Sequence, residues 1–326
     1  MSSQNPIEAL QPTQRRRRRG SIHFADHNAP KSVWEITGPD KPPYVAKLAT
    51  RPLSEIFSGL LLSKFNFQQL IYGVHKPGSD SAEQIIERIH SPVPQGRVVL
   101  EMALVTGRAI NNFRQTGTES AAQQLGALAV LDAVLNNTDR LPTITEHEGN
   151  WTNILETGTR IVPIDNQITL PDPEAKQGYL DRLTRLAEDV LSDGELCGPT
   201  PMPTVKRLQG RVARLGRLSH PMERLVTALL PHFSLQEDEL ERSVRVGARR
   251  TLFGFIAWKE IDFDKFHREI VKKTGAATFP GENLDDYITH LRDVHGQLVA
   301  VRNSLQRHSY LRRVSAREVF STVDMA

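Results

Sequence analysis

The chain has 326 residues, of which 39% are apolar, a composition that supports a sizeable folded core and excludes a disordered chain as a whole. Its formal net charge is +3, and the run Arg15–Arg19 alone carries five positive charges, so no general nucleic-acid-binding surface is expected. The single cysteine, Cys197, excludes an intramolecular disulfide framework and a multi-cysteine zinc site. The length predicts two compact lobes or one large domain.

The first hundred residues carry strand and turn signals. Residues 1–19 are polar and lack an apolar period, which predicts a disordered basic tail. Alternating or continuous apolar residues with turn residues between them favour strands, and Pro52 opens an apolar stripe typical of a helix. Strands are predicted at 21–25, 32–37, 44–49 and 97–103, and helices from 52 onward and at 79–89.

Beyond Gly107 the pattern becomes helical, with one exception. A helix is predicted over 118–136, followed by a turn at 138–142. Residues 153–165 form a β-hairpin pattern, and most of 174–310 is helical again. We therefore expect an α+β fold with two lobes and a cleft between them.

Lys47 lies in a strand that the pattern predicts to be buried, and a buried lysine needs a partner. Glu55, eight residues later on the following helix, is a candidate partner. Kinases use such a lysine–glutamate pair to hold the α- and β-phosphates of ATP. The alternative is a surface lysine whose stem lies along apolar neighbours, and the short motif taken alone favours that alternative.

Three further polar residues follow in order. Asp139 lies in the turn after the long helix, Asn153 follows 14 residues later, and Asp165 ends the returning strand. Asn153 and Asp165 are equally far from the turn centre near 158–159, so a hairpin would place them side by side. One or two oxygen ligands of this kind suit Mg²⁺. Each residue taken singly also fits a turn or cap role.

The segments around these residues resemble the catalytic core of atypical kinases with a protein-kinase-like fold, in particular the actin-fragmin kinase family. The resemblance covers roughly residues 20–175 and depends on 137–140, 149–155 and 164–166. Type II phosphatidylinositol 4-kinases share the Asn-Thr-Asp-Arg and Ile-Asp-Asn elements. The resemblance implies a bilobal fold, with a disordered tail at 1–19, a β-rich N-lobe at 20–105 and a mainly helical C-lobe with extra C-terminal helices at 106–326.

The resemblance also implies roles for individual residues. Lys47 would hold the ATP phosphates and Glu55 would orient it. Asp139 would orient or deprotonate the acceptor hydroxyl, and Asn153 and Asp165 would hold Mg²⁺. Further ATP contacts would come from the backbone of the inter-lobe hinge and from the phosphate-covering loop: Glu101, Met102, Ala103, Gly20 and Ser21.

Two departures from the pattern affect these roles. The phosphate-covering loop should be glycine-rich, yet only Gly20 is available, next to the arginine run. The gap between Asp139 and Asn153 is longer than the roughly five residues of ordinary protein kinases. Arg140 is expected to support the turn, and Asp132 to lie on a helix face rather than act as a ligand.

The leading hypothesis is an ATP- and Mg²⁺-dependent protein serine/threonine kinase, with actin or another protein as acceptor. One alternative is a phosphoinositide or small-molecule kinase. A loop that binds an inositol phosphate should carry several basic residues, whereas residues 166–180 contain a single one, Lys176. Another alternative is a catalytically weak pseudokinase scaffold.

The sequence also carries signals about location. No apolar run reaches the ~18 residues of a membrane span, and the N-terminus lacks the apolar segment of a signal peptide. We expect a cytoplasmic protein without a transmembrane segment. The Arg15–Arg19 run leaves nuclear entry open, and export into a host cell stays open as well.

Overall fold

The structure is a computed structural model. It describes residues 33–37, 42–89, 97–112, 117–142, 149–158, 160–191, 220–275 and 279–323, with side chains of the last helix as far as 307. The predicted tail, the strand at 21–25 and the loop at Gly20 and Ser21 lie outside these residues. Mixed helices and two small antiparallel sheets confirm the predicted α+β class.

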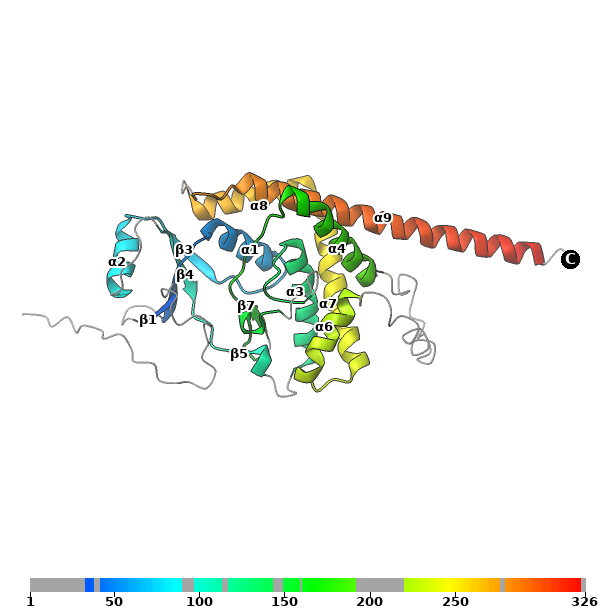
Figure 1. The fold of residues 1–326 in the computed structure, drawn as a ribbon, viewed down its shortest axis with the longest axis horizontal. Helices are drawn as coiled ribbons and strands as arrows, with labels where there is room; N and C mark the ends of the chain where they lie inside the picture. Colours follow the sequence, from blue (N-terminus) through cyan, green and yellow to red (C-terminus); the bar gives the residue numbers. More distant parts are fainter. Residues whose placement is uncertain are drawn as a thin grey trace, which may run out of the picture. The chain divides into compact units, whose positions relative to one another are not determined.

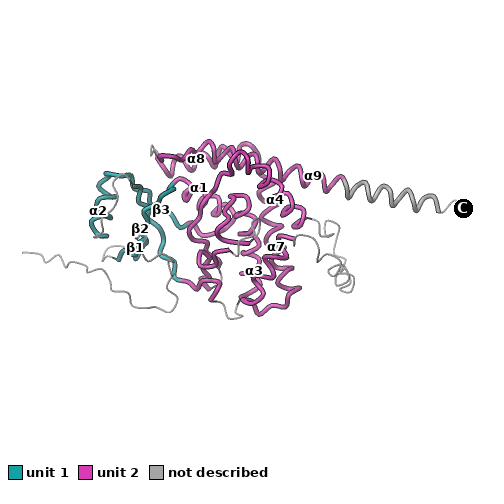
Figure 2. Tube along the Cα trace, viewed as in Figure 1, with its two compact units in different colours: residues 1–52, 70–106 teal, residues 53–69, 107–326 magenta. Residues whose placement is uncertain are grey.

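The chain divides into two compact units (Figure 2). Unit 1 comprises residues 1–52 and 70–106, and unit 2 comprises residues 53–69 and 107–326. The helix that begins at Pro52 thus belongs to unit 2, although the sequence analysis grouped it with the segment 20–105. No helix of the described part is long and apolar enough to cross a membrane.

Unit 1 is built on one antiparallel sheet with the strand order β1-β2-β4-β3. The strands and the helix described in this unit are β1 (Val33–Ile36), β2 (Tyr44–Leu48), β3 (Ile71–His75), α2 (Asp80–Ile89) and β4 (Val99–Ala103). The central strand β4 pairs with β2 from Tyr44 opposite Ala103 to Leu48 opposite Val99. The strands predicted near 32–37, 44–49 and 97–103 and the helix at 79–89 are confirmed.

Helix α2 covers one face of this sheet. Its Ala82 and Ile85 form one apolar cluster with Tyr44, Ala46 and Leu48 of β2. Lys47 lies between Ala46 and Leu48 in β2. Because successive side chains of a strand point to opposite faces of the sheet, Lys47 faces away from α2.

Unit 2 contains a second small sheet, in the order β5-β6-β7. Its strands are β5 (Arg108–Ala109), β6 (Ile154–Glu156) and β7 (Ile161–Pro163). The last two form the predicted hairpin, in register from Ile154 opposite Pro163 to Glu156 opposite Ile161. Gly158 in the turn has a φ of +76°, which glycine adopts without steric cost.

Most of the other residues that the structure describes in unit 2 are helical (Figure 1). Its helices are α1 (Pro52–Lys64), α3 (Glu119–Val134), α4 (Pro173–Leu191), α6 (Pro221–Leu229), α7 (Glu237–Ile256), α8 (Glu260–Thr274) and α9 (Leu284–Val323). Helices α3 and α7 lie side by side and touch at two glycines: a Cβ on Gly126 would lie 1.8 Å from the Val244 carbonyl oxygen, and one on Gly247 would lie 1.7 Å from that of Gln123.

Helix α1 packs on segments far away in the sequence. The Phe57 ring meets the rings of Phe266 in α8 and Tyr287 in α9 at centroid distances of 5.1 and 5.3 Å. The Glu282 carboxylate accepts hydrogen bonds from the N–H groups of Leu53 at 3.0 Å and Ser54 at 2.8 Å. A carboxylate at this position satisfies first-turn N–H groups and complements the helix dipole, so the C-terminal helices hold α1 in place.

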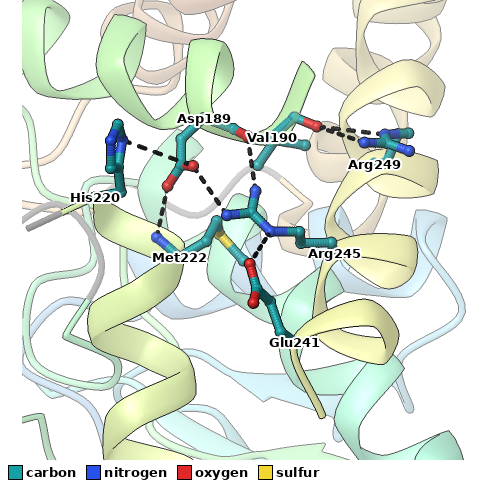
Figure 3. Close-up of polar contacts among 7 residues, drawn as sticks. All are labelled: Asp189, Val190, His220, Met222, Glu241, Arg245 and Arg249. Carbon is teal, nitrogen blue, oxygen red and sulfur yellow. Dashed lines mark hydrogen bonds and ion pairs between the residues drawn. The ribbon is translucent and has the colours of Figure 1, made fainter. Parts of the chain in front are cut away.

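A polar cluster joins α4, α6 and α7 (Figure 3). The buried Asp189 carboxylate of α4 accepts from the Met222 N–H at the start of α6, at 2.9 Å, and from Arg245 of α7, at 3.1 Å. Arg249 adds a bond to the Val190 carbonyl at 3.2 Å. These contacts hold the C-terminal end of α4 beside the N-terminal end of α6.

Candidate functional site

The turn after α3 presents the first predicted site residue. Asn136 has a φ of +50°, a conformation that asparagine tolerates better than most residues, and its Nδ2 donates to the Thr169 carbonyl at 3.0 Å. The Asn137 N–H donates a hydrogen bond to the Asp132 carbonyl at 2.8 Å, and Asn137 Oδ1 accepts one from the Asp139 N–H at 3.4 Å. The turn leaves Asp139 exposed to solvent.

Asp139 lies against two amide side chains from the segment before the hairpin. Asn153 Nδ2 donates to Asp139 Oδ2 at 3.0 Å, and Asn150 Nδ2 lies 3.4 Å from the same oxygen. The Asn150 N–H donates to the Asp139 carbonyl at 2.7 Å. Gly149, with a φ of +81°, permits this approach, because a Cβ there would lie 2.7 Å from the Arg140 carbonyl oxygen. The 14-residue gap therefore closes in space.

Asp165 follows the returning strand of the same hairpin. The Ile164 N–H donates to the Asn153 carbonyl at 2.9 Å, so the ladder extends to this pair and Asp165 comes one residue later. Asp165 is exposed and has a φ of +54°. A left-handed aspartate costs backbone energy and is a pointer to function. The residue directly opposite Asn153 is thus Ile164, and Asp165 lies one residue beyond the position that the sequence predicts.

Arg140 ties the turn to the segment that contains Asp165. Its side chain is fully buried, with 0% exposure. Nη2 donates to Asn166 Oδ1 at 2.7 Å and lies 3.5 Å from the Asp165 carbonyl oxygen. Nη1 forms an ion pair with Asp132 Oδ1 at 3.2 Å. The turn support expected of Arg140 is therefore realised through Asp132, a buried partner that the sequence analysis interpreted only as a helix-face residue.

Burial is the largest influence on the pKa of Asp132 in its ion pair with Arg140. Desolvation raises the pKa of the Asp132 carboxyl above its ordinary range, while the Arg140 guanidinium and the Asn137 amide lower it. Within the described part of the chain, Asp132 Oδ2 and Arg140 Nε find no hydrogen-bond partner. A buried pair that is only partly satisfied depends strongly on both members being present.

The predicted phosphate-binding pair lies in two different units. Lys47 is on β2 of unit 1, half-buried, on the sheet face away from α2 and opposite Leu100. Glu55 is on α1 of unit 2 and is 7% exposed. The pairing of Lys47 with Glu55 stays a prediction.

The predicted hinge residues lie in β4, between two neighbouring strands. The Ala103 N–H donates to the Leu70 carbonyl at 2.8 Å, so this donor is engaged within the sheet. The Glu101 carboxylate lies 2.9 Å from His75 Nε2, and Met102 is opposite Val45. Adenine recognition by the 101–103 backbone stays a prediction, as does the loop at Gly20 and Ser21, which lies outside the described residues.

The donor atoms near the hairpin are of the type that Mg²⁺ binds in proteins. The bond from Asn153 Nδ2 to Asp139 fixes which end of the amide is nitrogen and leaves Oδ1 as the ligand atom. Together with the Asp165 carboxylate this makes two oxygen donors, the number that Mg²⁺ commonly takes from a protein beside water and phosphate. No group of three or more His, Cys, Asp or Glu side chains suited to a metal occurs among the described residues.

Comparison of the chain with protein-family models and with curated protein sequences finds no match.

Proposed function

We propose that this chain is an ATP- and Mg²⁺-dependent phosphotransferase of protein-kinase-like architecture, and that its acceptor is a serine or threonine of a protein. One observation carries the proposal: Asn153 Nδ2 lies 3.0 Å from Asp139 Oδ2, next to the left-handed Asp165 at the end of the same hairpin. An aspartate, an amide and a second aspartate in this order are the parts that phosphoryl transfer uses for the acceptor and the metal.

Asp139 would act on the acceptor hydroxyl. Its carboxylate is exposed, and a carboxylate offers about four acceptor sites on its two oxygens. The amides of Asn150 and Asn153 both donate to Oδ2, so they orient the group and direct Oδ1 toward other partners. An oriented carboxylate of this kind accepts the hydroxyl proton and aligns the oxygen for attack.

Asn153 and Asp165 would hold the metal. Mg²⁺, when bound, neutralises charge on the phosphoryl oxygens. Asn153 is buried and anchored at its backbone by Ile164, at 2.9 Å, whereas Asp165 is exposed. One rigid ligand and one accessible ligand suit a metal that arrives together with a nucleotide.

Lys47 would hold the ATP phosphates in this proposal, oriented by Glu55, and the hinge at Glu101, Met102 and Ala103 would lie along adenine. Support for these roles comes from the strand position of Lys47 and from the resemblance of the motifs. Actin as the acceptor is supported by the resemblance alone. An experiment must distinguish this proposal from two alternative hypotheses, phosphate transfer to a phosphoinositide and a scaffold without activity.

Thermal unfolding tests nucleotide binding directly. A ligand at a hundredfold excess over its dissociation constant stabilises the folded state by about 2.7 kcal/mol. We expect Mg-ATP to raise the melting temperature of the wild type, and ATP with EDTA to raise it much less. Asp165→Asn should lose the Mg²⁺-dependent part, whereas Asp181→Ala, which removes an exposed aspartate of α4, should keep it.

A wild type whose melting temperature ignores Mg-ATP would contradict the proposal and favour a scaffold. A wild type that binds Mg-ATP yet labels phosphatidylinositol vesicles instead of proteins would contradict the assignment of the acceptor.

A further inference from the structure

Unit 1 contains a second group of polar side chains, which lies apart from Asp139, Asn153 and Asp165 of unit 2 and uses the carboxylate of Glu101, the residue whose backbone is proposed to lie along adenine. Ser81 lies at the second position of α2, and its Oγ is 2.9 Å from Nδ1 of His75 at the end of β3. The other ring nitrogen of His75, Nε2, is 2.9 Å from Oε2 of Glu101 on β4. A hydroxyl, an imidazole and a carboxylate thus form a continuous chain of hydrogen bonds.

The carboxylate determines the tautomer of a neutral imidazole. An ionised Glu101 can only accept, so a neutral His75 must carry its proton on Nε2 to bond to it. Nδ1 is then the unprotonated nitrogen, and the Ser81 hydroxyl donates to it. This is the arrangement of a nucleophile, a general base within hydrogen-bond reach, and a third group that orients the base.

The backbone makes room for this arrangement at one glycine. Gly73 is opposite Glu101 in the β3–β4 ladder. A Cβ on Gly73 would lie 2.8 Å from His75 Nε2 and 2.8 Å from Glu101 Cβ. A side chain there would push apart the imidazole and the carboxylate. His75 and Glu101 are largely shielded, with side-chain exposures of 17% and 13%, whereas Ser81 is exposed.

Another hydroxyl competes weakly for the Ser81 proton. Ser79 Oγ is 3.3 Å from Ser81 Oγ, a longer contact than the 2.9 Å to His75. Ser79 donates its own proton to the Lys76 carbonyl at 2.8 Å and accepts from the Ala82 N–H at 3.3 Å as the cap of α2. The Ser81 proton therefore has its shorter acceptor in His75.

We infer that Ser81 is a base-activated nucleophile that accepts an acyl group from a small ester with a good leaving group. In the step, Ser81 Oγ forms a bond to the acyl carbon, and the bond from that carbon to the leaving group breaks with its electron pair. The Ser81 proton passes to His75 Nδ1, and Glu101 stabilises the imidazolium. The imidazolium then gives this proton to the leaving group.

A fluorophosphonate probe tests this inference, since the serine oxygen displaces fluoride from phosphorus and the same proton passes to His75. The full-length protein is incubated with the probe at pH 8, and modified peptides are identified by mass spectrometry. Ser120 is a matched internal control. Ser120 is also exposed and also lies at the second position of its helix, α3. Its hydroxyl oxygen accepts a hydrogen bond from the Gln124 amide at 3.2 Å instead of contacting an imidazole.

We expect Ser81 to be labelled at least about a hundredfold faster than Ser120, the lower end of what a general base contributes. His75→Gln, which keeps a hydrogen-bonding side chain, should bring the Ser81 rate down to that of Ser120. Gly73→Ala removes none of the three polar groups and should lower the rate by disturbing their alignment. Circular dichroism establishes that each variant is folded.

Ser81 labelling in the folded wild type at the Ser120 rate would overturn the inference. The same conclusion would follow if a folded His75→Gln variant kept the wild-type rate. The three residues would then serve as a clamp between the start of α2 and the sheet, without nucleophilic reactivity.

Discussion

Replacement of Arg140 by methionine removes the cation at the centre of the buried network while keeping most of the side-chain volume. The variant leaves Asp132, which is 0% exposed, without its ion-pair partner, and Asn166 Oδ1 without its 2.7 Å donor. Loss of one member of a buried ion pair costs about 3–5 kcal/mol. We therefore expect Arg140→Met to lower the free energy of unfolding by about 4 kcal/mol at pH 9, where Asp132 is ionised in the wild type because its pKa is raised only to about 7.

The pH dependence shows whether Asp132 is the cause. A carboxyl that must stay neutral in the folded state, with an unfolded pKa of 3.8, costs about 1.4 kcal/mol for each pH unit above that value. The wild type bears the same cost up to its raised Asp132 pKa of about 7, so the part of the loss that comes from Asp132 is small at pH 7 and grows to about 2.7 kcal/mol at pH 9. The destabilisation of Arg140→Met relative to the wild type should therefore increase as the pH rises from 7 to 9.

Urea unfolding of the wild type and the variant, followed by circular dichroism at pH 7 and pH 9, measures both quantities. The double variant Asp132→Asn/Arg140→Met is the matched control, since it removes the charge and should recover most of the Asp132 part of the loss at pH 9. A single variant as stable as the wild type would refute the reasoning. So would a loss that is equal at both pH values and is not recovered by the double variant.

Two further predictions concern the helical core of unit 2. Burial lowers the pKa of His290 to about 4, where its Nε2 lies 3.2 Å from the Val134 carbonyl oxygen. The folded state favours the neutral imidazole, so the contribution of His290 to stability is present above the unfolded pKa of 6.5 and is lost as the pH falls toward 4. In urea titrations, the free energy of unfolding of the wild type should therefore fall by about 3 kcal/mol more than that of His290→Gln between pH 7 and pH 4. Gly126→Ala should destabilise by more than 2 kcal/mol because its Cβ would lie 1.8 Å from the Val244 carbonyl oxygen, whereas Gly178→Ala, at an exposed position of α4, should stabilise by about 0.5–1 kcal/mol. Thermal melts that rank the two alanine variants equally would contradict this packing argument.

Elements with strong local patterns were predictable from the sequence. Helix α3 has its cap at Thr118, whose side chain accepts from the Ala121 N–H at 3.2 Å, and a long apolar run. The hairpin of β6 and β7 has a glycine turn between two apolar segments. In both elements the residues that determine the structure are close together in the chain.

Elements that depend on distant partners were missed. Strand β3 (Ile71–His75) has exposed Tyr72 and a bulge next to it, so its period is broken and only pairing with β4 defines it. Strand β5 has two residues and exists through its pairing with β6. The assignment of α1 to unit 2 depends on Glu282, more than 200 residues away, which no local pattern reveals.

The candidate site divides in the same way. The resemblance of the motifs implied that Asp139 and Asn153 share a site although 14 residues separate them, and the 3.0 Å contact between them agrees. Asp132 was not recognised as the partner of Arg140, because an aspartate on an amphipathic helix is usually solvated. The signal lay in the composition of α3, where buried apolar residues occupy nearly every position around Asp132.

Transfer of labelled phosphate from Mg-[γ-³²P]ATP tests the central claim most directly, with actin and a whole-cell lysate as acceptors. The wild type, Asp165→Ala, Asp139→Asn and the exposed control Asp181→Ala would be compared at equal concentrations. We predict label on a protein band with the wild type and Asp181→Ala, no transfer with Asp165→Ala, and a loss of about 10²–10⁴-fold with Asp139→Asn. Substantial transfer by Asp165→Ala, or none by a folded wild type, would contradict the account.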